Sequence, residues 1–394
     1  MSSTVRLGII GYGTQGSMYA RLIAEGKVPS LSLCAVADAD SSKRDRVRSE
    51  HPDVEVFDDH ITMLESGEID AVVTCVPHYL HPEHAMAALA RGVHTLVEKP
   101  AGVYTQQVDE MNAFAAQHPE LTFGIMFNQR NNPLYQHLKQ VIDRGEIGRI
   151  LRTNWIITTW WRPQAYYESS AWRATWGGEG GGVLVNQAPH QLDLWQWLCG
   201  APKKVFAKAS YGFQRDIAVE DEVTALVDFG QGTTGTFTTS THDLLGTDRL
   251  EIVGEKGKIV VDNSRVATIT RYERTEQDIS ASIDAASVAR VFSGELDPAG
   301  FYTSETIDFT SKWGEQHAGV LENFARNIID DTPLIAPGSD GILGVRLANA
   351  IHLSSWLGEE VEMDFDQTRY LEELNRRITE ENQFAPRSTS SVDR

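Results

Sequence analysis

The chain has few cysteines and no long apolar run. Cys34, Cys75 and Cys199 are the only cysteines in 394 residues, and they lie far apart in apolar stretches. This distribution provides neither a disulfide framework nor the spacing of a zinc site. No apolar run approaches the roughly 20 residues that a membrane-spanning helix needs, and Met1–Thr4 has no feature of a signal peptide. We therefore expect a cytoplasmic protein with no membrane segment.

Basic residues are also scarce. Lysine and arginine number 35 against 55 aspartates and glutamates, which gives a formal net charge of −20. Such a balance disfavours nucleic acid and anionic membranes as partners. The histidines His78, His81 and His84 lack an accompanying set of cysteines or carboxylates, so we expect no metal site. The length of 394 residues favours two domains, and 41% hydrophobic residues can fill two cores.

A glycine motif near the N-terminus is the most informative feature that is present. The apolar run Val5–Ile10 leads into a G-x-G-x-x-G string, and a helical stretch follows from Ser17 to Ala24. This order of strand, glycines and helix is typical of dinucleotide binding. We expect the whole string to contact the cofactor, with one glycine each for the tight turn, the approach to the pyrophosphate and the packing of the helix; it comprises Gly11, Tyr12, Gly13, Thr14, Gln15 and Gly16.

An acidic residue stands where a ribose-binding carboxylate is expected. The next apolar run, 31–37, ends at Asp38, twenty-two residues after Gly16. We predict that Asp38 binds the ribose diol and favours NAD over NADP, although Arg44 nearby could support a 2′-phosphate. The alternative is a structural glycine turn followed by an incidental aspartate.

Apolar strands and helical patterns alternate through the first third of the chain. Strand-like runs at 71–76, 95–97 and 122–127 are separated by helical patterns near 60–68, 82–91 and 104–117. This alternation predicts an α/β fold that begins with a doubly wound parallel sheet, a Rossmann domain over residues 1–128.

Longer strands with turn signals follow a helix near 133–144. They predict one large, mostly antiparallel sheet in a second α/β domain over 129–380, which binds substrate and mediates oligomerisation; the strands are expected at 149–160, 203–212, 221–229, 232–240, 248–254 and 257–262. We also expect helices near 315–330 and 338–357, and a mobile tail over 381–394.

Two further strings supply polar residues. Pro77, His78 and His81 follow one predicted parallel strand, and Glu98-Lys99-Pro100 follows the next. Loops at the carboxyl ends of such strands face the ligand, so we expect these residues at the cofactor, with Lys99 near the nicotinamide. The alternative for Lys99 is a surface lysine.

The second string is rich in glycine and runs from Gly177 to Trp195. Asn186 and His190 stand four positions apart, and if the segment is helical they share one face and address one ligand. The alternative for His190 is a buried histidine with satisfied hydrogen bonds.

Aromatic residues gather between these strings, with arginines among them. We expect Trp155 in the core, while Trp161, Tyr166, Trp172 and Trp176 are candidates to stack on a sugar ring. A hydrophobic core or interface is the alternative for these four.

Together these strings resemble the Gfo/Idh/MocA oxidoreductase family. The resemblance implies that Lys99 lies beside the nicotinamide, that Arg173 reaches cofactor or substrate, and that His317 borders a sugar pocket. A surface residue at a helix start is the alternative for His317. The family pattern Asp-x-Gly-x-His-x-x-Asp is matched at His190 and Asp193, but this chain has Asn186 and Ala188 at the other two places. Asparagine orients a hydroxyl but cannot take its proton, so proton removal would fall on His190 and Lys99.

The resemblance implies an NAD-dependent oxidoreductase that interconverts a secondary hydroxyl and a ketone on a cyclitol or monosaccharide. Two alternatives stay open: an NAD-dependent glycoside hydrolase that oxidises C3 transiently, and a regulator that binds the cofactor without turnover. The open face of the large sheet favours a homodimer or homotetramer.

Overall fold

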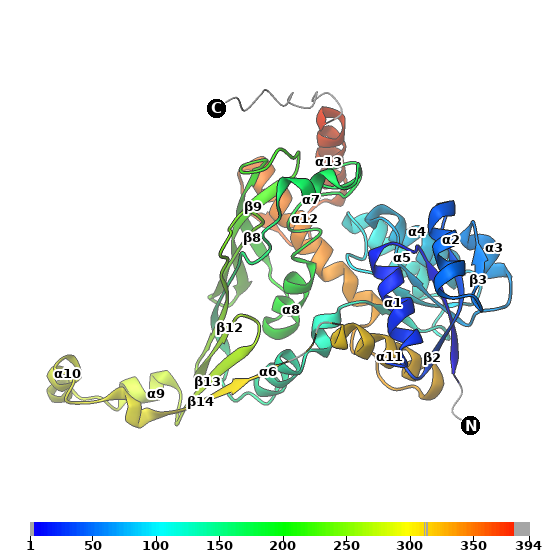
Figure 1. Ribbon diagram of the computed structural model, residues 1–394. Helices are drawn as coiled ribbons and strands as arrows, with labels where there is room; N and C mark the ends of the chain where they lie inside the picture. The colour runs from blue at the N-terminus through cyan, green and yellow to red at the C-terminus, as the bar shows by residue number, and fades with distance from the viewer. Residues whose placement is uncertain (1–3, 311, 313, 382–394) are drawn as a thin grey trace, which may run out of the picture.

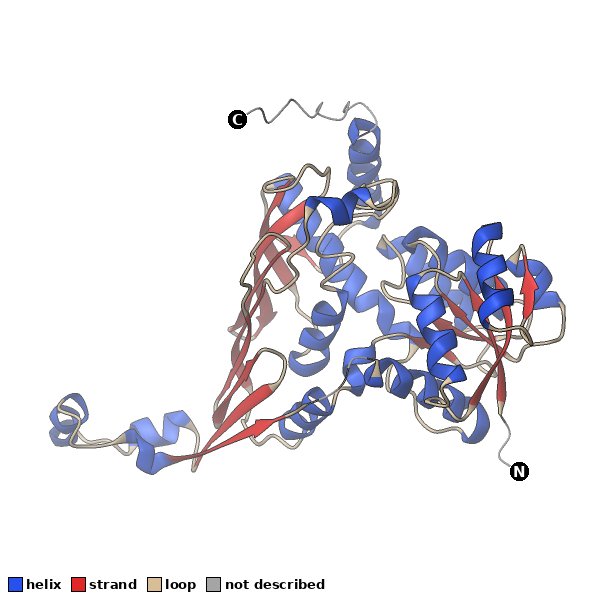
Figure 2. Cartoon of the chain, viewed as in Figure 1, coloured by secondary structure: helices blue, strands red, loops and turns tan. Residues whose placement is uncertain are grey.

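The computed structural model describes residues 4–310, 312 and 314–381, and two sheets organise it (Figure 1). Each sheet has helices packed against it, and the two lie on opposite sides of the molecule (Figure 2). The predicted tail over 381–394 lies outside the described residues except for Glu381, which ends the last helix.

The N-terminal sheet has six strands in the order β3-β2-β1-β4-β5-β6, and all neighbouring strands are parallel. The strands are β1 (Val5–Ile10), β2 (Leu31–Ala37), β3 (Glu55–Phe57), β4 (Ala71–Thr74), β5 (His94–Val97) and β6 (Phe123–Ile125). The covering helices are α1 (Thr14–Ala24), α2 (Ser41–Glu50), α3 (His60–Glu65), α4 (His81–Leu89) and α5 (Thr105–Ala115). The predicted Rossmann sheet is confirmed.

The second sheet has nine strands in the order β14-β13-β12-β11-β7-β10-β9-β8-β15. All its pairs are antiparallel except β7 with β10, which confirms the predicted class of sheet. The strands are β7 (Ile150–Ile157), β8 (Lys204–Tyr211), β9 (Glu220–Gly230), β10 (Thr233–Ser240), β11 (Asp248–Gly254), β12 (Gly257–Asp262), β13 (Val266–Tyr272), β14 (Tyr302–Asp308) and β15 (Val361–Glu362).

One face of this sheet is covered and the other is open. Helices α6 (Pro133–Asp143), α8 (Pro189–Cys199) and α12 (Gly341–Leu357) lie between the two sheets (Figure 1). Trp155 and Phe237 point to the covered face and are fully buried, because strand residues alternate between faces. Ile156, Phe206 and Leu226 stay exposed.

Several parts of the fold, among them α2, β3, β13 and β15, were not predicted from the sequence. An arm carrying α9 (Glu276–Ala281) and α10 (Ala285–Phe292) connects β13 to β14 and projects away from the body (Figure 1). Strand β14 is largely polar and exposed, so it lacks the apolar alternation that marks a half-buried strand. Helix α13 (Gln367–Glu381) buries only Tyr370 and Leu374.

The boundary at residue 128 separates the sheets but not the cores. Helix α11 (Glu315–Asp330) packs its residues Val320, Leu321 and Phe324 into the core of the Rossmann domain. Ser30 Oγ donates to the carboxylate of Glu322 at 2.6 Å, which ties this helix to the start of β2. The N-terminal domain is therefore completed by a segment from late in the chain, and the predicted second domain is not one continuous stretch.

Candidate active site

The glycine loop leaves an open space for a ligand. Gly11 has a φ of +94°, and a Cβ there would lie 2.4 Å from the carbonyl oxygen of Cys75. A Cβ on Gly16 would lie 2.0 Å from the carbonyl oxygen of Gly11. By contrast, a Cβ on Gly13 would meet nothing within 4 Å, and Gly13 caps α1 with no side-chain hydrogen bond. The first-turn N–H groups are thus open to an anion, and the loop fits a pyrophosphate.

Asp38 lies beside this loop, as predicted. Its carboxylate accepts hydrogen bonds from the backbone N–H of Tyr12 at 2.7 Å and of Asp40 at 2.9 Å. Lys43 Nζ is 3.6 Å from the same carboxylate, a contact that the sequence reasoning missed. Arg44 donates to the carbonyl oxygens of Asp38 and Ala39, so its guanidinium is held by backbone.

Only the backbone of Tyr12 faces the predicted cofactor. Its ring is fully buried, and its hydroxyl donates to Glu50 at 2.7 Å. The glycine motif specifies no side chain at this position, so the sequence could not show where the ring points.

Lys99 follows β5 and reaches the glycine-rich loop. Its side-chain Nζ donates to the backbone carbonyl of Asn186 at 2.8 Å. Its backbone N–H donates to the carboxylate of Glu98, also at 2.8 Å. Glu98 is 4% exposed and also accepts from the hydroxyl of Tyr19. Burial lowers the pKa of Lys99, against the opposing charges of Glu98 and Glu179.

Asn186 and His190 do not share a helix face. Helix α8 begins at Pro189, because the glycines before it form a succession of turns. Glu220 organises these turns by accepting from the N–H groups of Gly182 and Leu184 at 2.9 and 3.1 Å. The side-chain amide of Asn186 donates to Glu179. The predicted arrangement, in which Asn186 and His190 address one ligand from the same helix face, is therefore wrong.

His190 lies in the first turn of α8 with a buried ring nitrogen. Among the residues that the structure describes, its Nδ1 has no hydrogen-bond partner. Burial holds the pKa of His190 well below its usual value, with further lowering from the charge of Lys99 and from His317. The ring is therefore neutral near pH 7 and able to accept a proton.

His317 belongs to the same cluster. It lies in the first turn of α11 and is 8% exposed, so the alternative of a surface residue is wrong. The amide nitrogen of Asn128 is 3.0 Å from its Nε2. Burial and the charge of Lys99 lower the pKa of His317 to about 4. Asn128 was missed because it lies in the turn after β6 with no motif around it.

The remaining candidates include His78, Arg173 and the aromatic residues, which differ in their contacts and exposure. The Nδ1 of His78 is 3.1 Å from the carbonyl oxygen of Glu179, and its ring meets Trp172 edge to face at 5.8 Å. Arg173 lies over the rings of Trp172 and Tyr166 and donates to the Tyr166 hydroxyl at 2.8 Å. Trp161 is 41% exposed.

Two predicted site residues are structural instead. His81 has both ring nitrogens within hydrogen-bond distance of backbone carbonyls, those of Pro100 at 2.6 Å and Val76 at 2.8 Å. It therefore ties two loops together and has no nitrogen left for a cofactor. Trp176 is 3% exposed, donates to the Ala218 carbonyl and packs edge to face on Trp356, so it is not available to stack on a sugar.

Asp193, which matches the family pattern, anchors α8. Arg130 donates to both of its carboxylate oxygens, at 2.6 and 2.9 Å, and to Asp340 at 2.6 Å. The pair is buried, and burial raises the pKa of Asp193 to about 6 against the effect of Arg130. Because Asp340 precedes α12, this ion network connects three elements beneath the site.

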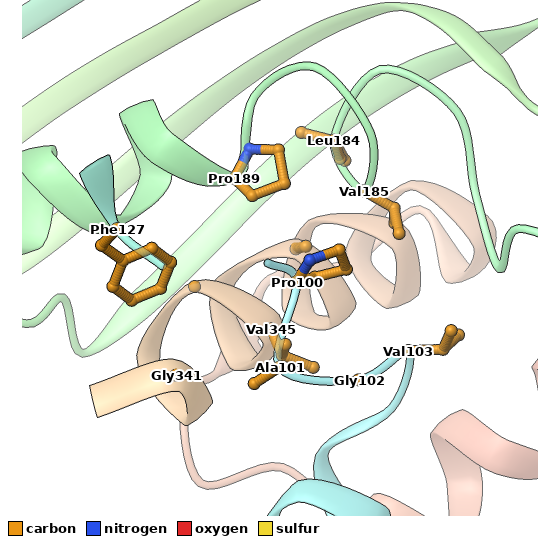
Figure 3. A pocket seen from close by; sticks show the side chains of 12 residues that line it. Pro100, Ala101, Gly102, Val103, Phe127, Leu184, Val185, Pro189, Gly341 and Val345 are labelled. Atoms are coloured by element: carbon orange, nitrogen blue, oxygen red, sulfur yellow. The ribbon is translucent and has the colours of Figure 1, made fainter. Parts of the chain in front are cut away.

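Apolar packing supports the loop after Lys99. A void of about 10 Å³, enough for about one water, is lined by Pro100, Val103, Leu184, Pro189 and their neighbours (Figure 3). Through these residues the loop after Lys99, the glycine-rich loop and α12 pack against one another. A larger cavity of about 950 Å³ opens near Arg173, between the β8–β9 loop and the end of α13, and Lys99 and His190 do not line it.

The described part of the chain contains no group of three or more His, Cys, Asp or Glu side chains that could hold a metal ion. None of its helices has both the length and the apolar character needed to cross a membrane.

Comparison with known proteins agrees with this geometry. The model of an oxidoreductase family with an NAD-binding Rossmann fold matches residues 5–124, and that of the GFO/IDH/MocA C-terminal domain matches residues 135–260. The fold and the site thus define an oxidoreductase with an NAD-binding Rossmann domain. The chain belongs to the Gfo/Idh/MocA family, which confirms the resemblance found in its sequence, and NAD is its cofactor.

Several relatives align with most of this chain at low sequence identity. Myo-inositol 2-dehydrogenase of Thermotoga maritima is 24% identical, covering 88% of this chain and 95% of its own. An NAD-dependent scyllo-inositol 2-dehydrogenase of Bacillus subtilis is 25% identical, covering 68% and 77%. The WlbA dehydrogenase of Bordetella pertussis, solved with NADH and UDP-GlcNAcA, has a TM-score of 0.73 at 23% identity, covering 92% of this chain and 100% of its own.

Proposed function

We propose that this protein is an NAD-dependent dehydrogenase that interconverts a secondary hydroxyl and a ketone on a cyclitol or monosaccharide. One observation carries the proposal: Lys99, His190 and His317 gather beside the predicted nicotinamide site, close enough that the charge of Lys99 lowers the pKa of both histidines. Relatives named as inositol dehydrogenases, and a fold shared with a levoglucosan dehydrogenase solved with NADH and levoglucosan, support this substrate class.

The residues divide the proton chemistry among them. Bound NAD supplies the hydride acceptor at its nicotinamide. His190, neutral and with an unpartnered buried nitrogen, takes the hydroxyl proton during oxidation and returns it during reduction. Lys99, fixed by the carbonyl of Asn186, polarises the substrate oxygen or relays its proton. His317 and Asn128 orient a second hydroxyl of the substrate.

A substrate screen tests this function. The full chain is incubated with NAD and a panel of inositols, aldoses and glycosides, and NADH formation is followed by absorbance. We expect NADH to accumulate with at least one cyclitol or free sugar, and Lys99→Ala should abolish that signal. Release of a sugar from a glycoside without net NADH would instead establish the hydrolase. If no compound reacts while NAD still binds, the dehydrogenase assignment fails.

We also propose that the protein assembles as a homodimer or homotetramer through the open face of the nine-stranded sheet. Ile156, Phe206 and Leu226 are 42%, 48% and 54% exposed on that face. Phe206 and Leu226 are direct partners on adjacent strands, so they form one apolar spot. Sedimentation should detect the oligomer, and replacing both residues by aspartate should dissociate it. A monomeric wild-type protein would contradict the proposal.

A further inference from the structure

A buried carboxylate lies behind the proposed proton-transfer groups. Glu179 is 2% exposed, although it lies in a glycine-rich segment, which would ordinarily be a surface loop. The glycines explain its depth, because a Cβ on Gly180 would lie 2.2 Å from Val103 and one on Gly182 would lie 2.1 Å from the Glu220 carbonyl oxygen. Only a chain without side chains at these positions packs closely enough to carry Glu179 inside.

Three different groups hold the Glu179 carboxylate. The backbone N–H of Ala174 donates to Oε2 at 2.7 Å, and the amide of Asn186 donates to Oε1. Arg173 brings its guanidinium to 3.7 Å from Oε1. Ala174 has a φ of 51°, so the backbone adopts a left-handed conformation at the residue whose N–H binds this carboxylate.

The contact with Asn186 fixes which way its amide points. An ionised carboxylate only accepts hydrogen bonds, so the NH₂ group of Asn186 faces Glu179 and the amide oxygen faces away. The backbone carbonyl of the same residue accepts from Lys99 at 2.8 Å. Glu179 therefore acts on Lys99 in two ways, through the position of Asn186 and through its own charge.

We propose that Glu179 is a positioning residue of the active site: it orients the Asn186 amide as a hydroxyl acceptor and keeps Lys99 in its charged form. The inference rests on the proposed dehydrogenase function for its kinetic consequences. Its electrostatic part does not need a substrate. The aspartate that the family pattern has at position 186 is absent here, and Glu179 places a carboxylate against that same side chain.

Several charged or titratable groups besides Glu179 interact electrostatically with Lys99: Glu98, Arg162 and Arg173 shift its pKa, and its own charge lowers the pKa of four histidines. Glu98 precedes Lys99 in the chain and accepts a hydrogen bond from its backbone N–H. The others are Arg162 and Arg173 from the aromatic segment, His78 and His81 after β4, His190 on α8 and His317 on α11. Glu98 is common to wild type and variant, so the effect of Glu179 can be separated by substitution.

The first experiment measures Lys99 directly. The wild-type chain, Glu179→Gln and the control Glu168→Gln are acylated over a range of pH, and modification of Lys99 is quantified by mass spectrometry. Glu168 is an exposed carboxylate in the preceding segment. We expect the apparent pKa of Lys99 to fall by about 1 in Glu179→Gln and not in the control. An unchanged pKa overturns the electrostatic part, whether or not a substrate is known.

The second experiment exchanges the two side chains. Glu179→Gln removes the charge, and Asn186→Asp sets two carboxylates against each other, so each single variant should lower kcat roughly tenfold or more. The double variant, Glu179→Gln with Asn186→Asp, restores an amide–carboxylate pair and one negative charge. We expect it to regain most of the lost kcat, and to return the alkaline limb of the pH profile toward wild type.

The outcomes separate this inference from the proposed function. If no sugar or cyclitol reacts with the wild-type chain, the dehydrogenase assignment fails while the labelling result still stands. If wild type is active and Glu179→Gln keeps its kcat and pH profile, the positioning role is overturned. If Glu179→Gln does not fold, the double variant decides, and a double variant that is unfolded or inactive overturns the role.

Discussion

The cofactor loop is built from one short stretch of chain, whereas the cluster around Lys99 draws on distant segments. In the loop, Gly11 and Gly16 leave no room for a Cβ and Gly13 leaves open space, so backbone sterics shape the site. In the cluster, side chains from the loop after β5, the glycine-rich loop, α8 and α11 meet. In the proposed function, the first region binds NAD through N–H groups and the second moves protons through titratable side chains.

This difference leads us to expect that cofactor binding and proton transfer are separated in the molecule. A change in the loop should act on NAD affinity or on folding of the Rossmann domain. A change in the cluster should act on turnover and on pH dependence while NAD binding persists.

The largest effect is expected in the cluster. Lys99→Ala and His190→Ala should each lower kcat by about two or more orders of magnitude, the scale for removal of a positioned acid or base. The Kd for NAD, measured by fluorescence titration, should change little. Lys203→Ala, an exposed lysine outside the site, is the matched control. Loss of NAD binding in parallel with kcat would show that the two regions are not independent.

The glycines of the loop should divide into two kinds. Gly16→Ala forces a Cβ to 2.0 Å from a backbone oxygen and should destabilise the protein by about 1 to 3 kcal/mol or more. Gly13→Ala has open space and should leave the thermal midpoint unchanged while weakening NAD binding about tenfold or more, because its methyl enters the pyrophosphate site. Calorimetry and NAD titration measure the two effects. Equal loss of stability in both variants would contradict this division.

Acid sensitivity should arise in the cluster. The pKa of His317 is about 4 when folded and near 6.5 when unfolded, so below pH 6.5 the unfolded chain binds more protons. Stability present above pH 6.5 is therefore lost as the pH falls toward 4. Between pH 6.5 and 5 this histidine should account for up to about 2 kcal/mol. Urea unfolding at pH 7 and pH 5 should show a smaller loss in His317→Asn than in wild type. A loss of the same size would rule out this histidine as the source.

The smallest effect is expected at the rim of the loop. Asp38→Ala removes a ribose acceptor and should reduce the preference for NAD over NADP by about tenfold or less. Lys43, now free of its ion pair, should assist by facing a 2′-phosphate. The ratio of kcat/KM for the two cofactors measures the change. A wild-type enzyme with equal efficiency on both would refute the predicted preference.

The fold was largely predictable because its signals are local. Five of the six parallel strands read as apolar runs, whereas β3 was not predicted. Strands β11 and β12 were predicted at their observed bounds. The arm, β14 and α13 were not predicted, and they bury few side chains. Helix α11 was predicted at its observed bounds, but its packing against the Rossmann core was not. An amphipathic pattern shows that one face of a helix is buried, but it does not show which element covers that face.

The site was predictable only in part. The sequence by itself determined the glycine loop and the placement of Asp38 and Lys99 near the carboxyl ends of strands, because short motifs and strand order set these positions. Only the tertiary structure decided that Asn186 lies before α8, that Trp176 and His81 are structural, and that His317 is buried beside Asn128. It also decided that Glu179 is inside, because the burial of a charge depends on partners that come from elsewhere in the chain.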